Sequence, residues 1–277
     1  MIRIAAVGDV HAGDDSRGML RPHLDRLADH ADLLLLAGDL TKRGRPAEAR
    51  VVVDELGGLG VPTVAVLGNH DYECDRAEEV AAILEAGGVR VLEGSSAMLE
   101  IEGLVVGVAG TKGFGGGFAG ACCTAFGEPE TKAFIGHTEA LAAGLESALH
   151  AIERADVRVA LLHYSPVADT LMGERLEIHP FLGSYLLAEA VDRAGADLVV
   201  HGHAHAGSEK GVTPGGVPVR NVAQPVLRRA YALLCLDGRR RAVGSGAPPP
   251  RPPWGATGAH GHLPTPVGRH TRPHASW

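Results

Sequence analysis

Short apolar runs alternate with amphipathic stretches over the first part of the chain. The apolar runs are those expected of strands in a largely buried sheet, and we predict strands at residues 2–7, 33–37 and 61–67. The stretches between them have helical spacing, with proline early in one and Gly87-Gly88 closing another, and we predict helices at residues 17–30, 46–59 and 75–86. This alternation predicts consecutive βα units.

The second part of the chain continues the mixed pattern with longer loops. Shorter strands are predicted at residues 89–92, 98–101 and 104–109, the last two joined in a hairpin at Glu102-Gly103, and we expect them to extend the same sheet. A glycine-rich loop covers residues 111–127. Further on, the pattern predicts a helix at 129–154 and strands at 157–162, 197–200, 217–222 and 230–236. The pattern alone gives a mixed α/β fold.

The composition changes near residue 243. From there the chain is rich in Pro, Gly, Arg and His, with three consecutive prolines at 248–250 and almost no apolar periodicity. Such a segment cannot bury enough apolar surface to form a core. We therefore predict one domain at residues 1–238 and a disordered tail at residues 243–277.

Charge and apolar content limit the classes of function. The chain has 277 residues, of which 45% are hydrophobic, and a net charge of -7. All acidic residues lie at or before Asp237, whereas six arginines follow it, so the predicted domain is more acidic than the whole chain. An acidic domain disfavours nucleic acid as a partner, because nucleic-acid binding needs basic surface. It suits metal binding.

Cellular location is indicated by what the sequence contains. Its apolar runs are far shorter than the roughly 20 residues that a membrane helix needs, so no membrane association is expected. The first residues lead directly into Gly8-Asp9 without the regions of a signal peptide. Four cysteines show no paired spacing, and we expect reduced thiols. We predict a cytoplasmic protein; the sequence leaves its oligomeric state open.

Side chains that can bind metals follow the predicted strands. In chain order the segments are Asp9-Val10-His11, Gly38-Asp39, Gly68-Asn69-His70-Asp71, His163 and Gly202-His203-Ala204-His205. Open α/β sheets bind ligands beyond the carboxyl ends of their strands, so we expect these segments to form one site. Carboxylates can bridge two cations while imidazoles and an amide oxygen complete each coordination shell.

These segments resemble the pattern of the calcineurin-like metallophosphoesterase superfamily, namely D-x-H, G-D, G-N-H-D/E, a lone H and G-H-x-H, over residues 1 to about 236. The resemblance implies a four-layer α/β/β/α sandwich with two divalent metal ions, which could be Mn, Fe, Zn or Ni. By resemblance one ion is bound by Asp9, His11 and His205, the other by Asn69, His163 and His203, with Asp39 bridging them. His70 is then the catalytic histidine near the leaving group.

The resemblance implies a phosphohydrolase that cleaves a phosphate ester by in-line attack of a metal-bridging hydroxide. A phosphodiester is favoured, since Asp71 stands where the Ser/Thr protein phosphatases have Glu. Lys42 also replaces an aspartate that supports the catalytic histidine in that branch, so Asp71 or another carboxylate has to orient His70. We expect a small phosphorylated substrate, with a nucleotide as one candidate. The alternatives are a phosphomonoesterase or nucleotide pyrophosphatase, and a non-catalytic scaffold, which the complete ligand set argues against.

Several residues have a structural alternative. The glycines before the predicted ligands can serve tight turns, Asp9 or Asp39 can cap helices, and we interpret His201 as structural or as supporting a ligand. Tyr164 and Arg175 lie in a loop that could hold a phosphate ester. Four phenylalanines either cap the pocket or form a small satellite core, which we favour; they are Phe114, Phe118, Phe126 and Phe134.

Overall fold

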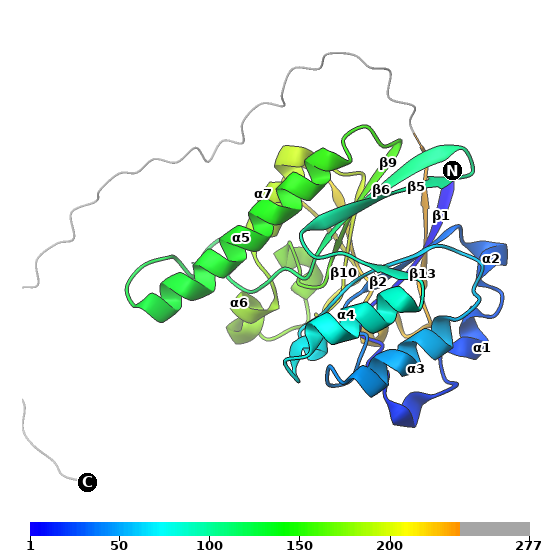
Figure 1. Cartoon of the computed structure of the whole chain (residues 1–277). Helices are drawn as coiled ribbons and strands as arrows, with labels where there is room; N and C mark the ends of the chain where they lie inside the picture. Colours follow the sequence, from blue (N-terminus) through cyan, green and yellow to red (C-terminus); the bar gives the residue numbers. More distant parts are fainter. Residues whose placement is uncertain (239–277) are drawn as a thin grey trace, which may run out of the picture. The chain divides into compact units, whose positions relative to one another are not determined.

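The computed structural model describes residues 1–238. Two large sheets face each other and helices cover their outer faces (Figure 1). This arrangement confirms the predicted α/β/β/α sandwich. The predicted tail at residues 243–277 lies outside the described residues. Within the described part, no helix is both long and apolar enough to cross a membrane, and all four cysteines are free thiols.

The first sheet has the strand order β13-β1-β2-β3-β4. Strands β1, β2, β3 and β4 run parallel to one another, whereas β13 runs antiparallel to β1. The bounds are β1 Ile2–Val7, β2 Leu33–Ala37, β3 Thr63–Val66, β4 Val89–Val91 and β13 Ala232–Leu236. The predicted strands of the βα units are therefore confirmed, with the last strand returning to pair with the first.

The second sheet has the order β11-β12-β10-β9-β6-β5. Its strands are β5 Ser95–Ile101, β6 Leu104–Thr111, β9 Val157–Leu162, β10 Leu198–His201, β11 Lys210–Val212 and β12 Pro218–Asn221. Strands β5 and β6 form the predicted hairpin at Glu102-Gly103, where both residues have a positive φ. The prediction that the strands at residues 89–92, 98–101 and 104–109 extend the first sheet is confirmed for β4 but was wrong for β5 and β6, which belong to the second sheet. A separate small hairpin consists of β7 Gly117–Phe118 and β8 Ala121–Cys122.

Helices cover the two outer faces. Figure 1 shows α1, α3 and α4 on one side of the sandwich and α5 and α7 on the other. Their bounds are α1 Arg21–Leu24, α2 Leu27–His30, α3 Pro46–Leu56, α4 Ala77–Ala86, α5 Pro129–Ala151, α6 His179–Leu182, α7 Tyr185–Ala194 and α8 Gln224–Leu227. Short 3₁₀ turns lie at Asp14–Ser16, His70–Tyr72, Ala168–Leu171 and Leu176–Ile178.

The prediction of a single helix at residues 17–30 was wrong. The segment instead forms a turn followed by the two short helices α1 and α2. The carboxylate of Glu55, on α3, accepts hydrogen bonds from the backbone N–H groups of Gly18, Leu20 and Arg21. These contacts occupy N–H groups in the turn before α1 and at its first residue, so a tertiary interaction replaces the helical start that the local pattern suggested.

Side chains alternate between two cores along the strands of the first sheet. In β1, Ile2, Ile4 and Ala6 face the second sheet and pack in the central core with residues such as Val159. Ala5 and Val7 face the opposite way and pack with the helices. A third core lies between the second sheet and its helices α5 and α7. Because both faces of each sheet are buried, the strand ends are the places where polar side chains can gather.

Candidate metal centre

All eight predicted site residues follow strands at the same end of the two sheets. Asp39 follows β2, His163 follows β9, and the remaining residues lie in the loops after β1, β3 and β10. Among residues 1–238, three overlapping groups bring possible ligand atoms within 4.8 Å of one another: Asp9 with His11 and His205, His11 with Asp39 and His70, and Asp39 with His163 and His203. The structure therefore gathers the predicted residues into one site.

The backbone of the site adopts the left-handed region at four residues that carry polar side chains. The φ angles are 58° at Asp9, 44° at His11, 50° at Asp39 and 69° at His203. Side chains other than glycine adopt this conformation at a cost, and such residues cluster at functional sites. The loops are thus held in a costly conformation where the candidate ligands lie.

Two glycines are required by the close approach of these loops. A Cβ atom at Gly68 would collide with the Asp39 carboxylate and backbone, and one at Gly202 would collide with the Asp9 carboxylate. Neither glycine has a positive φ. The absence of a side chain therefore lets loops from different strands pack against the two aspartates, which goes beyond the simple turn function considered from sequence.

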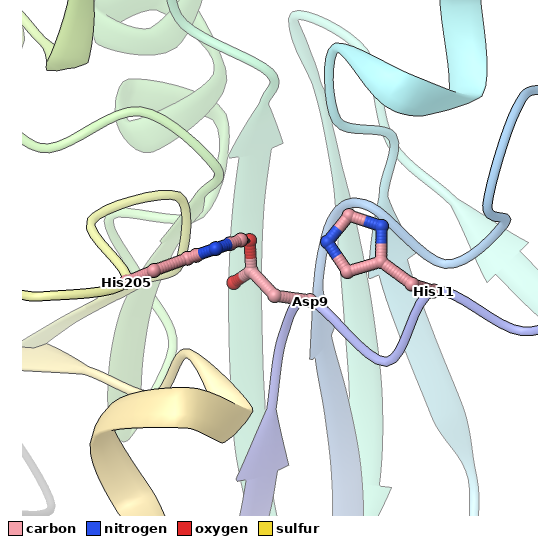
Figure 2. A group of neighbouring side chains, drawn as sticks. All are labelled: Asp9, His11 and His205. Atoms are coloured by element: carbon pink, nitrogen blue, oxygen red, sulfur yellow. The ribbon is translucent and has the colours of Figure 1, made fainter.

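The first group consists of Asp9, His11 and His205 (Figure 2). Figure 2 shows the His205 ring reaching the Asp9 carboxylate from one side while the His11 ring lies on the other side. The Nε2 atom of His205 lies 2.8 Å from Oδ1 of Asp9, and the backbone N–H of His203 donates to the same carboxylate at 3.0 and 3.1 Å. Asp9 is thereby held from two directions by the loop after β10.

Charge and burial act in opposite directions at Asp9. Burial alone would raise its pKa, but the hydrogen bond from His205 and the neighbouring imidazoles outweigh burial and lower the pKa below its ordinary value. The same hydrogen bond raises the pKa of His205. Asp9 therefore remains an anionic carboxylate in a buried position, as a metal ligand must.

The second group contains Asp39, His163 and His203, with Asn69 beside them. The Nδ1–H of His163 donates to the Ala37 carbonyl at 2.8 Å. Its other nitrogen, Nε2, lies 3.0 Å from Oδ1 of Asn69 and 3.3 Å from Oδ1 of Asp39. With Nδ1 protonated in the neutral ring, this nitrogen offers a lone pair next to two acceptor oxygens. A divalent cation bound by all three atoms would remove that conflict, so the residues present fit a metal ion.

His203 is also suited to metal binding. Burial lowers the pKa of His203 to about 3, so its imidazole is neutral near pH 7. Its Nε2 lies 3.3 Å from the Phe181 carbonyl oxygen. As the Nε2–H tautomer it donates to that carbonyl, and Nδ1 is left as the ligand atom. A backbone carbonyl that orients a ligating histidine in this way is common in metal sites.

His70 lies at the edge of the site. Its Nε2 is 3.9 Å from Oδ2 of Asp39, and its ring contacts that of His11 with 4.5 Å between centroids. Its Nδ1 lies 3.0 Å from the Lys42 carbonyl oxygen. That contact fixes the ring through the backbone of Lys42, so the side chain at position 42 is not what orients His70. The Lys42 ammonium instead pairs with Asp15.

Asp71 does not orient His70, contrary to one alternative considered from sequence. Its carboxylate is fully buried and accepts hydrogen bonds from the backbone of Leu40, Thr41 and Gly68 and from the Thr41 hydroxyl, at 2.6 to 3.2 Å. It therefore joins the loop after β2 to the loop after β3. A nearer carboxylate is that of Glu73, 3.7 Å from Nδ1 of His70.

Other residues considered from sequence lie outside the groups. His201 is fully buried, and its two nitrogens contact the Gly202 carbonyl and the Thr170 hydroxyl at 2.8 Å each, in keeping with the structural interpretation. Phe118 packs in a small satellite core with Leu171, Leu182 and Ala204, whereas Phe126 is exposed. Phe114 packs against Phe134 and Tyr164. Three of the four phenylalanines thus pack against other side chains, which favours the structural interpretation over a pocket cap.

Sequence reasoning missed the backbone carbonyls of Lys42, Ala37 and Phe181, each of which contacts an imidazole of the site. A carbonyl group is present at every residue, so the sequence carries no signal for these roles. It also missed that Tyr164 packs against His203, with 4.2 Å between ring centroids. Its position directly after His163 was the available signal.

Comparison with known proteins identifies the family of this chain. The family model for the calcineurin-like phosphoesterases matches residues 2–207. The chain therefore belongs to the calcineurin-like phosphoesterase family, whose members use divalent metals, and it is a phosphoric ester hydrolase. No curated protein matches the sequence.

Solved structures share the fold. The phosphopantetheinyl hydrolase PptH of Mycobacterium tuberculosis superposes with a TM-score of 0.59 at 15% identity, over 87% of this chain and 98% of that chain. The protein TT1561 of Thermus thermophilus gives 0.56 at 19% identity, over 84% and 93%. A putative 5'-nucleotidase from Staphylococcus aureus gives 0.50 at 19% identity, over 79% and 48%. At these identities the likeness establishes the fold.

Proposed function

We propose that this protein is a two-metal hydrolase of small phosphate esters, with phosphodiesters preferred. The observation that carries the proposal is that the candidate ligands form three overlapping groups in one site, with Asp9, His11 and His205 in one group and Asp39, His163 and His203 in another. Asp9, His11 and His205 would hold one ion. Asn69, His163 and His203 would hold the other, and Asp39 would bridge them. Two ions in such a site supply Lewis acidity and an activated water for attack on phosphorus.

The protein's residues have separate tasks in this reaction. Asp9 and Asp39 would provide carboxylate oxygens in a buried site, and the histidines would provide ring nitrogens. His70 lies beside Asp39 with its ring fixed by the Lys42 carbonyl. We assign His70 the role of donating a proton, or a hydrogen bond, to the leaving oxygen. A positioned histidine in this role typically raises the reaction rate by about 10² to 10⁴-fold, on the order of several kcal/mol of activation free energy.

Preference for a diester rests on the sequence of the loops. Asp71 joins two loops through backbone hydrogen bonds, and Lys42 replaces the aspartate that supports the histidine in the protein-phosphatase branch. Both features favour the small-substrate branches over a protein phosphatase. A nucleotide with a phosphodiester or pyrophosphate bond is one candidate substrate, and the acidic domain disfavours a nuclease.

A substrate panel with a metal-site variant tests the proposal. Purified protein is reconstituted with Mn²⁺ and assayed on aryl phosphomonoesters, aryl phosphodiesters, cyclic nucleotides and pyrophosphates. We expect the highest kcat/KM on a diester, two metal ions per chain, and loss of turnover in Asp39→Asn and His203→Ala. Asp75→Asn, which changes an exposed carboxylate before α4, is the control and should retain activity. Normal turnover by Asp39→Asn at full metal content would contradict the proposal.

Metal content separates the enzyme from a non-catalytic scaffold with the same fold. A catalytic protein should retain close to two ions per chain after reconstitution and dialysis. Fewer than one tightly bound ion per chain, together with no turnover on any ester of the panel, would favour the scaffold.

A further inference from the structure

A buried lysine lies beside the candidate metal centre without a carboxylate partner. Lys112 follows β6 and is 8% exposed. Among the residues that the structure describes, no carboxylate oxygen lies within 4.0 Å of its ammonium; its one hydrogen bond there is to the Gly113 carbonyl, at 3.3 Å. An ammonium group has three donors, and burying it without a counterion is costly. The position therefore calls for an explanation.

Aromatic rings surround this ammonium. Its Nζ atom lies 5.1 Å from the ring centroid of Tyr72, 4.9 Å from that of Phe114 and 5.2 Å from that of Tyr164. Each distance is within the roughly 6 Å over which a cation is attracted to a ring face. The rings hold the charge in place but accept no ordinary hydrogen bond, so they leave donors of the ammonium available.

The acidic side chain of Glu93, whose charge acts on Lys112, is committed to other groups. Glu93 accepts hydrogen bonds from the Thr111 hydroxyl at 2.8 Å and from the backbone N–H of Lys112 at 3.2 and 3.3 Å, and the Tyr72 hydroxyl lies 3.5 Å away. These contacts orient the Glu93 carboxylate toward the backbone. Glu93 thus positions the residue Lys112 and one wall of its ring cage without forming a salt bridge with the ammonium.

Three contacts connect Lys112 to the metal centre. Its carbonyl oxygen accepts hydrogen bonds from the backbone N–H groups of His163 and Tyr164 at 3.1 and 3.0 Å. The Tyr164 ring that the ammonium contacts also packs on the His203 ring, with 4.2 Å between centroids. Tyr72, a second wall of the cage, belongs to the short 3₁₀ turn that begins at His70. The Tyr164 ring therefore contacts both the Lys112 ammonium and the ring of His203, a candidate ligand of the second ion.

We propose that the ammonium of Lys112 binds a phosphate oxygen of the substrate, which supplies the missing counterion. The proposal rests on the proposed function, because the phosphate has to occupy the metal centre. The phosphate bound by Lys112 is either the reacting group or a second phosphate attached to it. Lys112 is then a substrate-binding residue whose carbonyl contacts the backbone N–H of His163, and it lies outside all five predicted ligand segments.

The test compares Lys112→Met with Lys132→Met. Methionine keeps most of the length of the side chain and its packing against the rings but removes the charge, and Lys132 is an exposed lysine on α5. The dissociation constants of inorganic phosphate and pyrophosphate are measured by calorimetry on metal-loaded protein, with the metal in excess. Because a hydrogen bond to a charged group is among the stronger ones in proteins, we expect Lys112→Met to weaken binding about tenfold or more and Lys132→Met to leave it unchanged.

The two ligands distinguish the two sources of phosphate. If Lys112 contacts the reacting group, Lys112→Met weakens the binding of inorganic phosphate and pyrophosphate alike. If it contacts a second phosphate, only pyrophosphate binding weakens. Unchanged binding of both ligands overturns the proposal, and so does failure of the metal-loaded wild type to bind either.

Stability and turnover separate this proposal from two other outcomes. A purely structural lysine would lower the melting temperature when replaced and leave both dissociation constants unchanged; Lys112→Gln is the second variant if Lys112→Met does not fold. Where the wild type hydrolyses the ester panel, we expect a raised KM in Lys112→Met. If the wild type hydrolyses nothing, the proposed function fails, but the comparison of phosphate binding still decides the role of Lys112.

Discussion

The Nε2 atom of His163 and the Oδ1 atom of Asn69 lie 3.0 Å apart, and the hydrogen bond from His163 Nδ1 to the Ala37 carbonyl, at 2.8 Å, leaves Nε2 without a proton in the neutral ring. Two acceptors at that distance repel each other unless a cation lies between them. Since the two residues follow strands of different sheets, β9 and β3, this pair joins the two halves of the sandwich at the site.

The first prediction uses two histidines at the ends of neighbouring strands. Replacing His163 with Ala should reduce the affinity for one metal ion by more than about tenfold. Even residues that only hydrogen-bond to a metal ligand typically change metal affinity by about 10 to 100-fold when they are replaced. Replacing His201, which is buried with both nitrogens hydrogen-bonded, should preserve metal content and lower the free energy of unfolding by about 1–3 kcal/mol. Metal analysis after dialysis and denaturant unfolding measure the two effects. The same metal loss in both variants would contradict the assignment.

A second prediction concerns the buried carboxylate that joins two loops of the site. Asp71→Ala removes the acceptor for three backbone N–H groups and the Thr41 hydroxyl. Each buried donor left without a partner costs about 1–3 kcal/mol, so the free energy of unfolding should fall by about 3 kcal/mol or more. Chemical denaturation measures this change. Glu78→Gln, an exposed change in the first turn of α4, should stay within about 0.5 kcal/mol of the wild type.

The order of the site residues was readable from sequence because each follows an apolar run. Their convergence needs only that parallel strands end at the same edge, which the structure confirms for Asp39 and Asn69. The division into two sheets was not readable, because only residues 92–94 separate the three-residue strand β4 from β5. The residues of a short strand do not specify which other strand it will pair with. The supporting carbonyls and the contacts of Glu55 are tertiary, so local patterns could not reveal them.

The third prediction concerns what orients His70. Because its Nδ1 contacts the carbonyl of Lys42 rather than the side chain, Lys42→Ala should leave kcat within about twofold of the wild type, since its ammonium forms only an exposed pair with Asp15. His70→Ala should lower kcat by about 10² to 10⁴-fold. Steady-state kinetics on an aryl diester measures both. A large loss of kcat in Lys42→Ala at normal metal content would show that the side chain takes part.

The last prediction concerns the conformational cost of the loop after β1. His11 has a φ of 44°, in the region where a residue with a Cβ atom is less stable than glycine by about 1–2 kcal/mol. His11→Ala and His11→Gly both remove the imidazole, and both should lose metal and turnover. Their stabilities should nevertheless differ, with the metal-free glycine variant more stable by about 1 kcal/mol because glycine adopts a positive φ freely.

Denaturant unfolding of the two metal-free variants, compared at one pH in the presence of a chelator, measures that difference. Met98→Ala and Met98→Gly, at an exposed position in β5 where φ is negative, serve as the matched pair. There the glycine variant should be the less stable one, because glycine loses more conformational freedom on folding. If glycine is less stable than alanine at both positions, the loop at His11 carries no conformational cost, and its geometry reflects only the contacts around it.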